Sequence, residues 1–115
     1  MPRQYFLCDL RDDAAAQSAY RRYHAAGAVW PEVLRSIRGA GITGLEIHLA
    51  GNRLLMVMET DASYDAAARA ERDAADPVVQ RWENLMDTFQ QRLPFATDGE
   101  KWVPMERIFD LHEQP

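Results

Sequence analysis

Residues 42–60 carry the pattern of an antiparallel hairpin, and this pattern limits the possible folds of the chain more than any other feature. In Ile42–Ala50, apolar side chains alternate with other residues, which is the period of a strand with one covered face. Gly51-Asn52 is a two-residue turn signal, and the segment Arg53–Thr60, rich in Leu and Met, forms the returning strand. Such a hairpin needs further elements to cover its apolar face.

Shorter patterns on either side of the hairpin predict the remaining elements. Asp12 and Asp13 begin a helix, because acidic side chains are favourable near a helix N-terminus. Asp76-Pro77 opens another, with an aspartate cap and a proline in the first turn, and we expect Pro94 to end it. The predicted elements are strands at 4–10, 42–50, 53–60 and 102–111, helices at 12–26, 31–39 and 77–93, and a partly helical segment at 61–75.

The order of these elements predicts a ferredoxin-like split βαβ fold of the α+β class. Strand, helix, strand, strand, helix and strand form an antiparallel sheet with the helices on one face. Nothing divides the chain, so residues 1–115 are expected to form a single domain. No segment is left to cover the second face of the sheet. We therefore expect a homodimer joined through that face, a dimeric α+β barrel.

Charge and cysteine content narrow the partners and the compartment. The formal net charge of −5 at pH 7 argues against nucleic acid or an anionic membrane as the main partner. The stretch MPRQYFLCDL lacks the long apolar core of a signal peptide, and no segment is long enough to span a bilayer. Cys8 is the only cysteine and cannot form an intramolecular disulfide, which favours a cytoplasmic location.

Tyr20 and His24 are the first candidates for a functional site. Four residues apart on one face of a helix, they combine a phenol with an imidazole, which can give and accept a proton near neutral pH. By spacing alone, a partly buried aromatic edge with a satisfied histidine is the simpler interpretation. Trp82 also has two interpretations, a core anchor or a platform that packs against the C–H face of a sugar.

The predicted hairpin supplies a second candidate, because Glu46 and His48 share one strand face. A carboxylate on a packed sheet face needs a partner or a ligand. Together with His24 and His112, His48 completes no HExxH or paired-cysteine signature, so we expect no metal. No glycine-rich phosphate loop is present, so no nucleotide cofactor is expected either.

Four short motifs in a fixed order resemble the L-rhamnose mutarotase family. They are Tyr20 and His24, Trp30-Pro31-Glu32, Gly51-Asn52-Arg53, and Gln80-Arg81-Trp82. The resemblance extends from the first predicted strand to the last. It implies a dimeric ferredoxin-like fold and interconversion of the α and β anomers of a 6-deoxy-hexose, without a metal or an organic cofactor.

The resemblance also assigns roles to individual residues. His24 matches the family's proton donor, and Tyr20 matches a tyrosine that contacts the sugar. Trp82 matches the first of two adjacent tryptophans that line the site, whereas Glu83 stands in place of the second. Leu45 replaces a further tyrosine that contacts the substrate in rhamnose enzymes.

These departures look more like a branch of the family that acts on L-fucose. Glu46-Ile47, Met56 with Met58, and the tail GEKWVPMERIF at 99–109 are similar to that branch. The two sugars differ in hydroxyl configuration, so a changed set of polar contacts is what a change of substrate requires. L-Fucose is therefore the favoured substrate and L-rhamnose the alternative.

Mutarotation requires a base that removes the anomeric proton and an acid that protonates the ring oxygen. We expect His24 to protonate the ring oxygen while Tyr20 orients it or contacts a hydroxyl. Glu46 is the candidate for a second acid–base or hydroxyl-binding group. Trp82 and Trp30 are expected to form apolar walls, with Glu83 as a further substrate contact. A monooxygenase-like enzyme or a non-catalytic ligand-binding dimer on the same fold remains the alternative to an isomerase.

Overall fold

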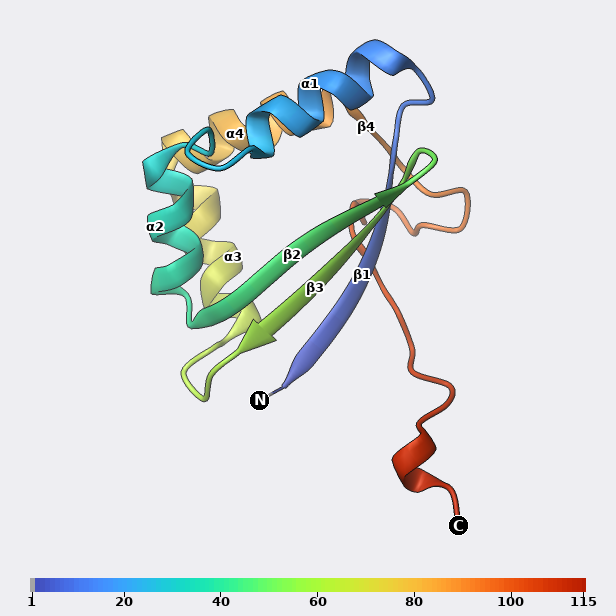
Figure 1. Cartoon of the computed structure of the whole chain (residues 1–115). Helices are drawn as coiled ribbons and strands as arrows, with labels where there is room; N and C mark the ends of the chain where they lie inside the picture. Colours follow the sequence, from blue (N-terminus) through green and yellow to red (C-terminus); the bar gives the residue numbers. More distant parts are fainter. Residues whose placement is uncertain (1) are drawn as a thin grey trace.

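The computed structural model describes residues 2–115 and shows an antiparallel sheet with helices on one side (Figure 1). The strands lie in the order β2-β3-β1-β4, and β5 also pairs with β1. This is the strand order of a ferredoxin-like sheet, so the predicted fold class is confirmed. The elements are β1 Arg3–Leu10, α1 Ala14–His24, α2 Pro31–Gly39, β2 Ile42–Ala50, β3 Arg53–Thr60, α3 Ala66–Ala75, α4 Pro77–Asp87, β4 Gln90–Gln91, β5 Val103–Pro104 and the 3₁₀ helix η1 Leu111–Glu113.

The hairpin of β2 and β3 forms with the predicted bounds. Ile47 pairs with Met56 and Leu45 with Met58, so these four apolar side chains share one face. Gly51 takes a φ of 61°, which a glycine adopts without strain in this tight turn. On the other side of β3, β1 pairs along nearly its whole length, from Arg3 opposite Glu59 to Asp9 opposite Arg53.

Aspartate caps determine where three helices begin. Asp13 accepts a hydrogen bond from the backbone N–H of Ala16, and Asp65 caps α3 in the same way. Asp76 ends α3 and caps α4, because Pro77 suits a first helical turn and cannot continue the preceding helix. The helical connection between β3 and β4 is therefore divided into α3 and α4.

Two of the predicted bounds near the C-terminus are wrong. The last long helix ends at Asp87, well before Pro94, and the chain enters the two-residue strand β4. The strand expected over 102–111 is limited to β5. After Met105 donates its N–H to Tyr5, the chain leaves the sheet as an extended tail (Figure 1). Among residues 2–115, no strand pairs with this tail beyond β5. A strand without a partner has no ladder of hydrogen bonds to hold it.

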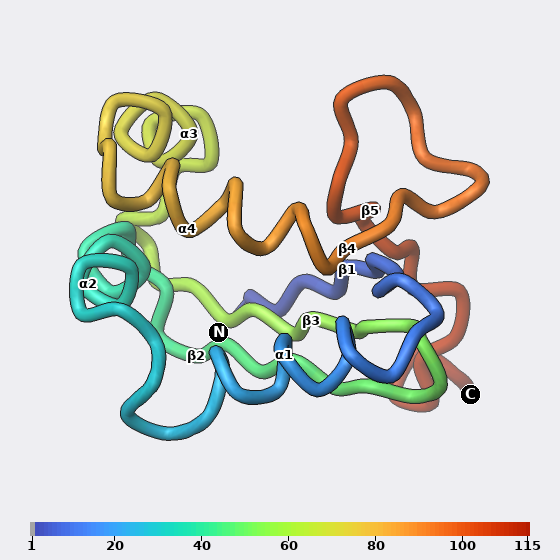
Figure 2. Tube along the Cα trace, turned by 90° about the horizontal axis from the view of Figure 1, so that it is seen from above, coloured from blue at the N-terminus to red at the C-terminus, as the bar shows by residue number. Residues whose placement is uncertain are grey.

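The helices cover only one face of the sheet. Figure 2 shows α1 and α4 running along the sheet, while α2 and α3 stand together at one end. The main core forms between these helices and the sheet, and its buried members are Leu10, Tyr20, Val33, Leu54, Trp82 and Met86. None of the helices in residues 2–115 has the length and apolar character needed to cross a membrane.

Within the described residues, no helix covers the opposite face, which we call the bare face. Successive side chains of a strand alternate between faces, so the ladders His48–Leu55–Leu7 and Glu46–Val57–Tyr5 both lie here. Its centre is therefore apolar. Ion pairs surround this centre, and they join Arg3 to Glu59, His48 to Glu46 and Arg53 to Asp9.

Candidate active site

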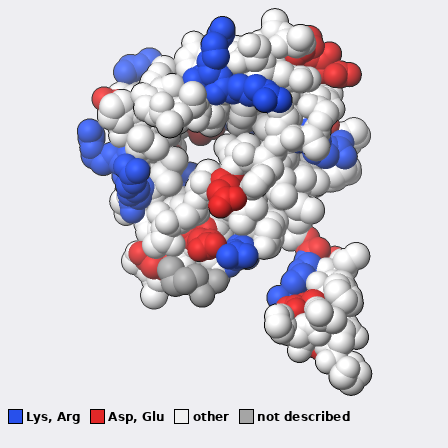
Figure 3. Space-filling model, in the orientation of Figure 1, with Lys and Arg blue, Asp and Glu red and all other residues white. Residues whose placement is uncertain are grey.

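A cleft of about 870 Å³ lies between the helices and the covered face of the sheet. Figure 3 shows the side of the molecule on which this hollow opens. Its volume lies within the usual range for small-molecule sites, roughly 300–1,000 Å³. Apolar strand residues such as Phe6, Ile47 and Met56 form its floor. One part of the lining is formed by Tyr20, His24, Trp82, Glu83, Gln90 and Trp102. Polar residues of α2 and α3 also line the cleft, and they are Ser36, Arg38, Arg69 and Asp73.

His24 is the last residue of α1, and a contact with the backbone determines which of its ring nitrogens carries the hydrogen. Nδ1 lies 2.8 Å from the carbonyl oxygen of Tyr20. A carbonyl oxygen only accepts, so Nδ1 carries the hydrogen and Nε2 of the neutral ring keeps its lone pair. Burial lowers the pKa of His24, and the hydrogen bond to Tyr20 opposes this only in part. His24 is therefore a neutral base at physiological pH.

Tyr20 lies directly beneath His24 in the cleft wall. The two rings stack with their centroids 4.1 Å apart, and the tyrosine is only 4% exposed. Burial raises the pKa of Tyr20 well above its usual range, so its hydroxyl keeps the proton. The pair is thus both an aromatic edge of the core and part of the cleft wall.

Gln90 is a cleft residue that the sequence analysis missed. Its Nε2 donates to the hydroxyl of Tyr20 at 3.4 Å, while its Oε1 is buried and accepts no hydrogen bond within residues 2–115. The only sequence signal was a pair of glutamines between a helix and a proline, which has no periodicity. The contact places a polar side chain against the Tyr20 hydroxyl at the end of the cleft.

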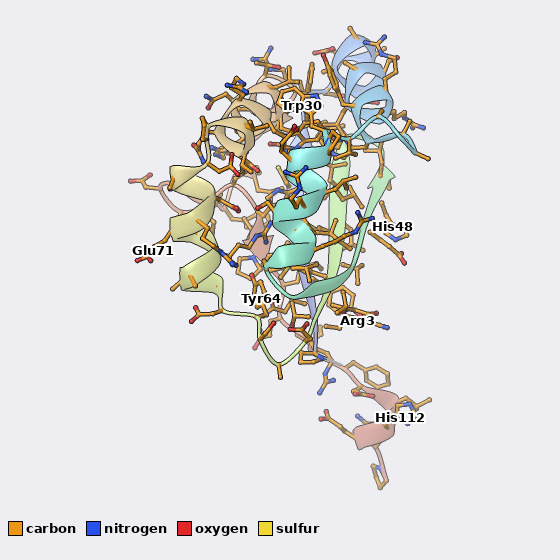
Figure 4. The ribbon with its side chains drawn as sticks, turned by 90° about the vertical axis from the view of Figure 1, so that its left-hand side faces the viewer. Arg3, Trp30, His48, Tyr64, Glu71 and His112 are labelled. Atoms are coloured by element: carbon orange, nitrogen blue, oxygen red, sulfur yellow. The ribbon has the colours of Figure 1, made fainter. Side chains whose placement is uncertain are left out.

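Trp82 combines the two roles that its spacing left open. It is 6% exposed and belongs to the core, yet it also lines the cleft. Its ring meets His24 edge-on at 5.4 Å and Trp30 at 5.2 Å between centroids. Trp30 lies where α2 comes near α1 and α4 (Figure 4), and it is not among the residues that line the cleft. Trp30 therefore supports the wall formed by Trp82.

Glu83 borders the cleft beside Trp82 and is held by a lysine from a distant segment. Lys101 Nζ donates to Glu83 Oε2 at 2.8 Å and lies 2.9 Å from Asp87 Oδ1. Burial by itself would lower the pKa of Lys101, but the hydrogen bonds to the two carboxylates outweigh it and raise the pKa. The ammonium group stays charged. Lys101 was part of the tail motif at 99–109, but the motif assigned it no role.

Glu46 lies on the bare face, away from the cleft. Leu45 and Ile47 point toward the helices, so the pleat of β2 directs Glu46 and His48 the other way. Glu46 is 72% exposed in its side chain, and its Oε1 accepts from His48 Nε2 at 2.9 Å. Figure 4 shows His48 on the side of the sheet away from α2. The structure does not bring Glu46 together with His24.

The described residues also bear on metal and thiol chemistry. No group of three His, Cys, Asp or Glu side chains within residues 2–115 is placed to hold a metal ion. Cys8 is fully buried on the helix-covered side of β1, and burial raises the pKa of its thiol to about 11. A thiol in this state is a poor nucleophile.

Comparison with known proteins identifies the relatives of this chain. The family model for L-rhamnose mutarotase matches residues 3–111. The chain belongs to the L-rhamnose mutarotase family. Within the family, an L-fucose mutarotase from Xanthomonas campestris pv. campestris is 50% identical over 113 residues, which is 98% of this chain and 90% of the relative.

Two solved structures share the fold of this family member. The crystal structure of an L-rhamnose mutarotase from Formosa agariphila has a TM-score of 0.69 and 21% identity, covering 96% of this chain and 99% of the other. Tetracenomycin F2 cyclase from Streptomyces glaucescens, a type-II polyketide cyclase, has a TM-score of 0.63 and 15% identity, covering 96% of each chain. At these identities the likeness concerns the fold, and it shows that unrelated chemistries use this scaffold.

The positions that the resemblance to the mutarotase family assigns to the sugar site can now be located in the cleft. His24, Tyr20 and Trp82, the residues that resemblance assigned to the sugar site, meet at one end of the cleft. Glu83, which stands where that family has a second tryptophan, borders the same end. The individual roles of these residues are predictions, and they are developed below.

Proposed function

We propose that the protein interconverts the α and β anomers of L-fucose, and that the reaction takes place at the His24 end of the cleft. The observation that carries this proposal is the neutral imidazole of His24, whose Nδ1 is tied to a backbone carbonyl and whose Nε2 is left as a base. A family match over residues 3–111 and a 50% identical L-fucose mutarotase support the same reaction.

A single imidazole can carry out the proton transfers of ring opening. Nε2 of His24 takes the proton from the anomeric hydroxyl and passes it to the ring oxygen as the bond between the anomeric carbon and the ring oxygen breaks. Both oxygens are bonded to the same carbon, so one base can reach both. The open aldehyde rotates, the ring oxygen attacks the other face, and the proton returns along the same route. His24 thus acts first as a base and then as the proton donor that resemblance implied.

The groups around His24 are suited to hold a 6-deoxy sugar. Tyr20 keeps its proton and can donate a hydrogen bond to a sugar oxygen. The indole of Trp82 provides an apolar wall for the C–H face of the ring and for the methyl group that replaces the hydroxyl on the last carbon. Glu46 lies on the other face of the sheet, so no role in this cleft is proposed for it.

L-Fucose is preferred over L-rhamnose because of Glu83. A carboxylate at this position accepts hydrogen bonds from hydroxyls, whereas the second tryptophan of rhamnose enzymes, as the resemblance has it, offers an apolar face. A pocket that pairs with a particular hydroxyl rejects a sugar in which that hydroxyl points elsewhere. The relative in Xanthomonas campestris carries the name L-fucose mutarotase, which agrees with this preference.

We propose a homodimer that joins two bare faces. An apolar centre at Tyr5, Leu7, Leu55 and Val57, surrounded by ion pairs, has the character of an interface with a dry core and a polar rim. Two copies related by a twofold axis would cover each other's exposed sheet. The single buried cysteine suits a reducing compartment, and a cytoplasmic location is proposed on that basis.

NMR saturation transfer between the anomeric protons tests the proposed reaction. The protein should accelerate exchange between the α and β signals of L-fucose well above the rate of the sugar alone, and accelerate L-rhamnose less. If it accelerates neither sugar, the mutarotase proposal is wrong. If L-rhamnose exchanges faster than L-fucose, the family assignment stands and the preferred substrate is corrected.

A further inference from the structure

Lys101 is the only lysine in the chain, and its side chain is 15% exposed. It belongs to the segment between β4 and β5, which crosses from the sheet to α4 and back. Its ammonium group lies between the carboxylates of Glu83 and Asp87, one turn apart on α4. The mechanism proposed above makes no use of this buried cation.

The contact with Lys101 determines how much of Glu83 remains available. Oε2 of Glu83 accepts the hydrogen bond from Lys101, and within residues 2–115 no hydrogen bond is made to Oε1. Glu83 borders the cleft, so this second oxygen is the one free to accept from a ligand. A glutamate side chain that is held at one oxygen loses less conformational entropy when the other binds.

The neighbour of Lys101 links the same contact to the cleft wall. Trp102 lines the cleft and packs against the main core cluster, and the chain then pairs with β1 through Val103 opposite Leu7. The segment is therefore fastened at two points, by Lys101 to α4 and by β5 to the sheet. Trp102, which lines the cleft, lies between these two fastenings.

We propose that Lys101 is a positioning residue for the sugar site, which holds the carboxylate of Glu83 so that its free oxygen accepts a hydrogen bond from a sugar hydroxyl. The inference rests on the proposed mutarotase function and adds to it the group that sets hydroxyl recognition. Lys101 acts through Glu83 and touches no reacting atom. Substrate affinity should therefore depend on it more than turnover does.

A double-mutant cycle between Lys101→Met and Glu83→Gln tests this coupling. Each single variant should raise the KM for L-fucose by roughly 10-fold, the scale of one lost hydrogen bond to a charged group, and change kcat by less than about threefold. In the double variant the effects should not multiply, because the neutral amide of the Glu83→Gln variant has already lost the carboxylate that Lys101 holds through an ion pair. Lys101→Arg, which keeps the cation, should recover part of the affinity.

Asp87→Asn is the matched control. It removes the other carboxylate that contacts Lys101 but leaves the Glu83 hydrogen bond, so the KM should change by less than about twofold. The proposal is overturned if Lys101→Met leaves the KM unchanged, or if its effect is equally large in the Glu83→Gln background. The second result would mean that Lys101 only holds the loop in place.

Because the chain has one lysine, its side-chain NMR signal is unique and reports on the site without turnover. Labelled wild-type protein is titrated with L-fucose, and the Lys101 signal should shift in a saturable manner. A shift without anomeric exchange would contradict the mutarotase function and preserve Lys101 as part of a sugar-binding site. Anomeric exchange without a shift of the Lys101 signal would support the mutarotase function and contradict the role of Lys101 in the sugar site.

Discussion

The two faces of the sheet are made by the same three long strands, yet their side chains differ in kind. The covered face presents Phe6, Ile47 and Met56 to a cleft whose far wall carries a histidine and several aromatic rings. The bare face presents an apolar centre, with charged side chains that remain largely in solvent. One histidine lies on each side of the sheet, His24 on α1 in the cleft wall and His48 on the bare face, so the two environments can be compared directly.

His24 and His48 show what this difference does to chemistry. His24 is enclosed by Tyr20 and Trp82, and burial lowers its pKa and keeps it neutral. His48 is more than half exposed and pairs with the carboxylate of Glu46 at the surface. A surface pair of this type contributes little to stability. This difference agrees with the proposed division of roles, in which the covered face carries catalysis and the bare face binds a second copy.

Replacing each histidine by alanine should give the largest difference in activity between the two sides of the sheet. His24→Ala removes the proposed proton carrier and should lower the rate of L-fucose exchange by about 10²–10⁴-fold. His48→Ala should leave the rate within about twofold, as expected for a surface change far from the site. Both rates come from saturation transfer. Equal losses in the two variants would show that the faces do not divide the functions in this way.

A charge in the centre of the bare face should separate the subunits. Leu55→Glu places a carboxylate opposite its own copy in the proposed dimer, and we expect the dissociation constant to rise at least about 100-fold, since burying an unpaired charge is costly. Light scattering coupled to size-exclusion chromatography measures the mass. Glu46→Gln, on the polar rim, is the control and should remain dimeric. A wild-type protein that elutes as a monomer would refute the proposed assembly.

Exchanging one residue at the cleft should shift the preferred sugar. Glu83→Trp replaces the hydroxyl-accepting carboxylate by the residue that resemblance assigns to rhamnose enzymes. The ratio of kcat/KM for L-fucose over L-rhamnose should fall by roughly 10-fold, the value of one specific polar contact. An unchanged ratio, with both sugars affected equally, would mean that Glu83 does not read the configuration of a hydroxyl.

The smallest of the expected effects is the change of the L-fucose exchange rate with pH. The neutral form of His24 is the proposed base, and its lowered pKa means that this form persists as the pH falls. The exchange rate, after subtraction of the spontaneous rate, should therefore stay level down to about pH 6.5, the ordinary histidine value, and fall only below it. Half-maximal activity at or above that pH would contradict a buried, neutral His24.

Local chemistry explains why much of the fold could be predicted. Gly51-Asn52, the aspartate caps and the prolines at helix starts act through their nearest neighbours, and the elements they predict are present. The strand expected over 102–111 failed because a strand also depends on a partner. The strand β4, Gln90–Gln91, carries no alternating pattern, and its position comes from pairing with β1.

The residues of the candidate site that lie on elements with a periodic pattern could be predicted from the sequence, and those on segments without one could not. Tyr20 and His24 meet because they share a helix face, and Trp82 joins them from the apolar side of another helix. The alternation of Leu45, Glu46 and Ile47 already implied that Glu46 points away from the helices. Gln90 and Lys101 come from segments without periodicity, and only the three-dimensional structure places them beside the cleft.

The central claim is that the sugar binds on the covered face, at His24. The chain has three histidines, one in the cleft, one on the bare face and one in the tail, so NMR of histidine-labelled protein resolves the three regions. On addition of L-fucose, the ring signals of His24 should shift while those of His48 and His112 stay in place, and Nδ1 of His24 should carry the hydrogen. A shift of His48 without one of His24 would contradict the account.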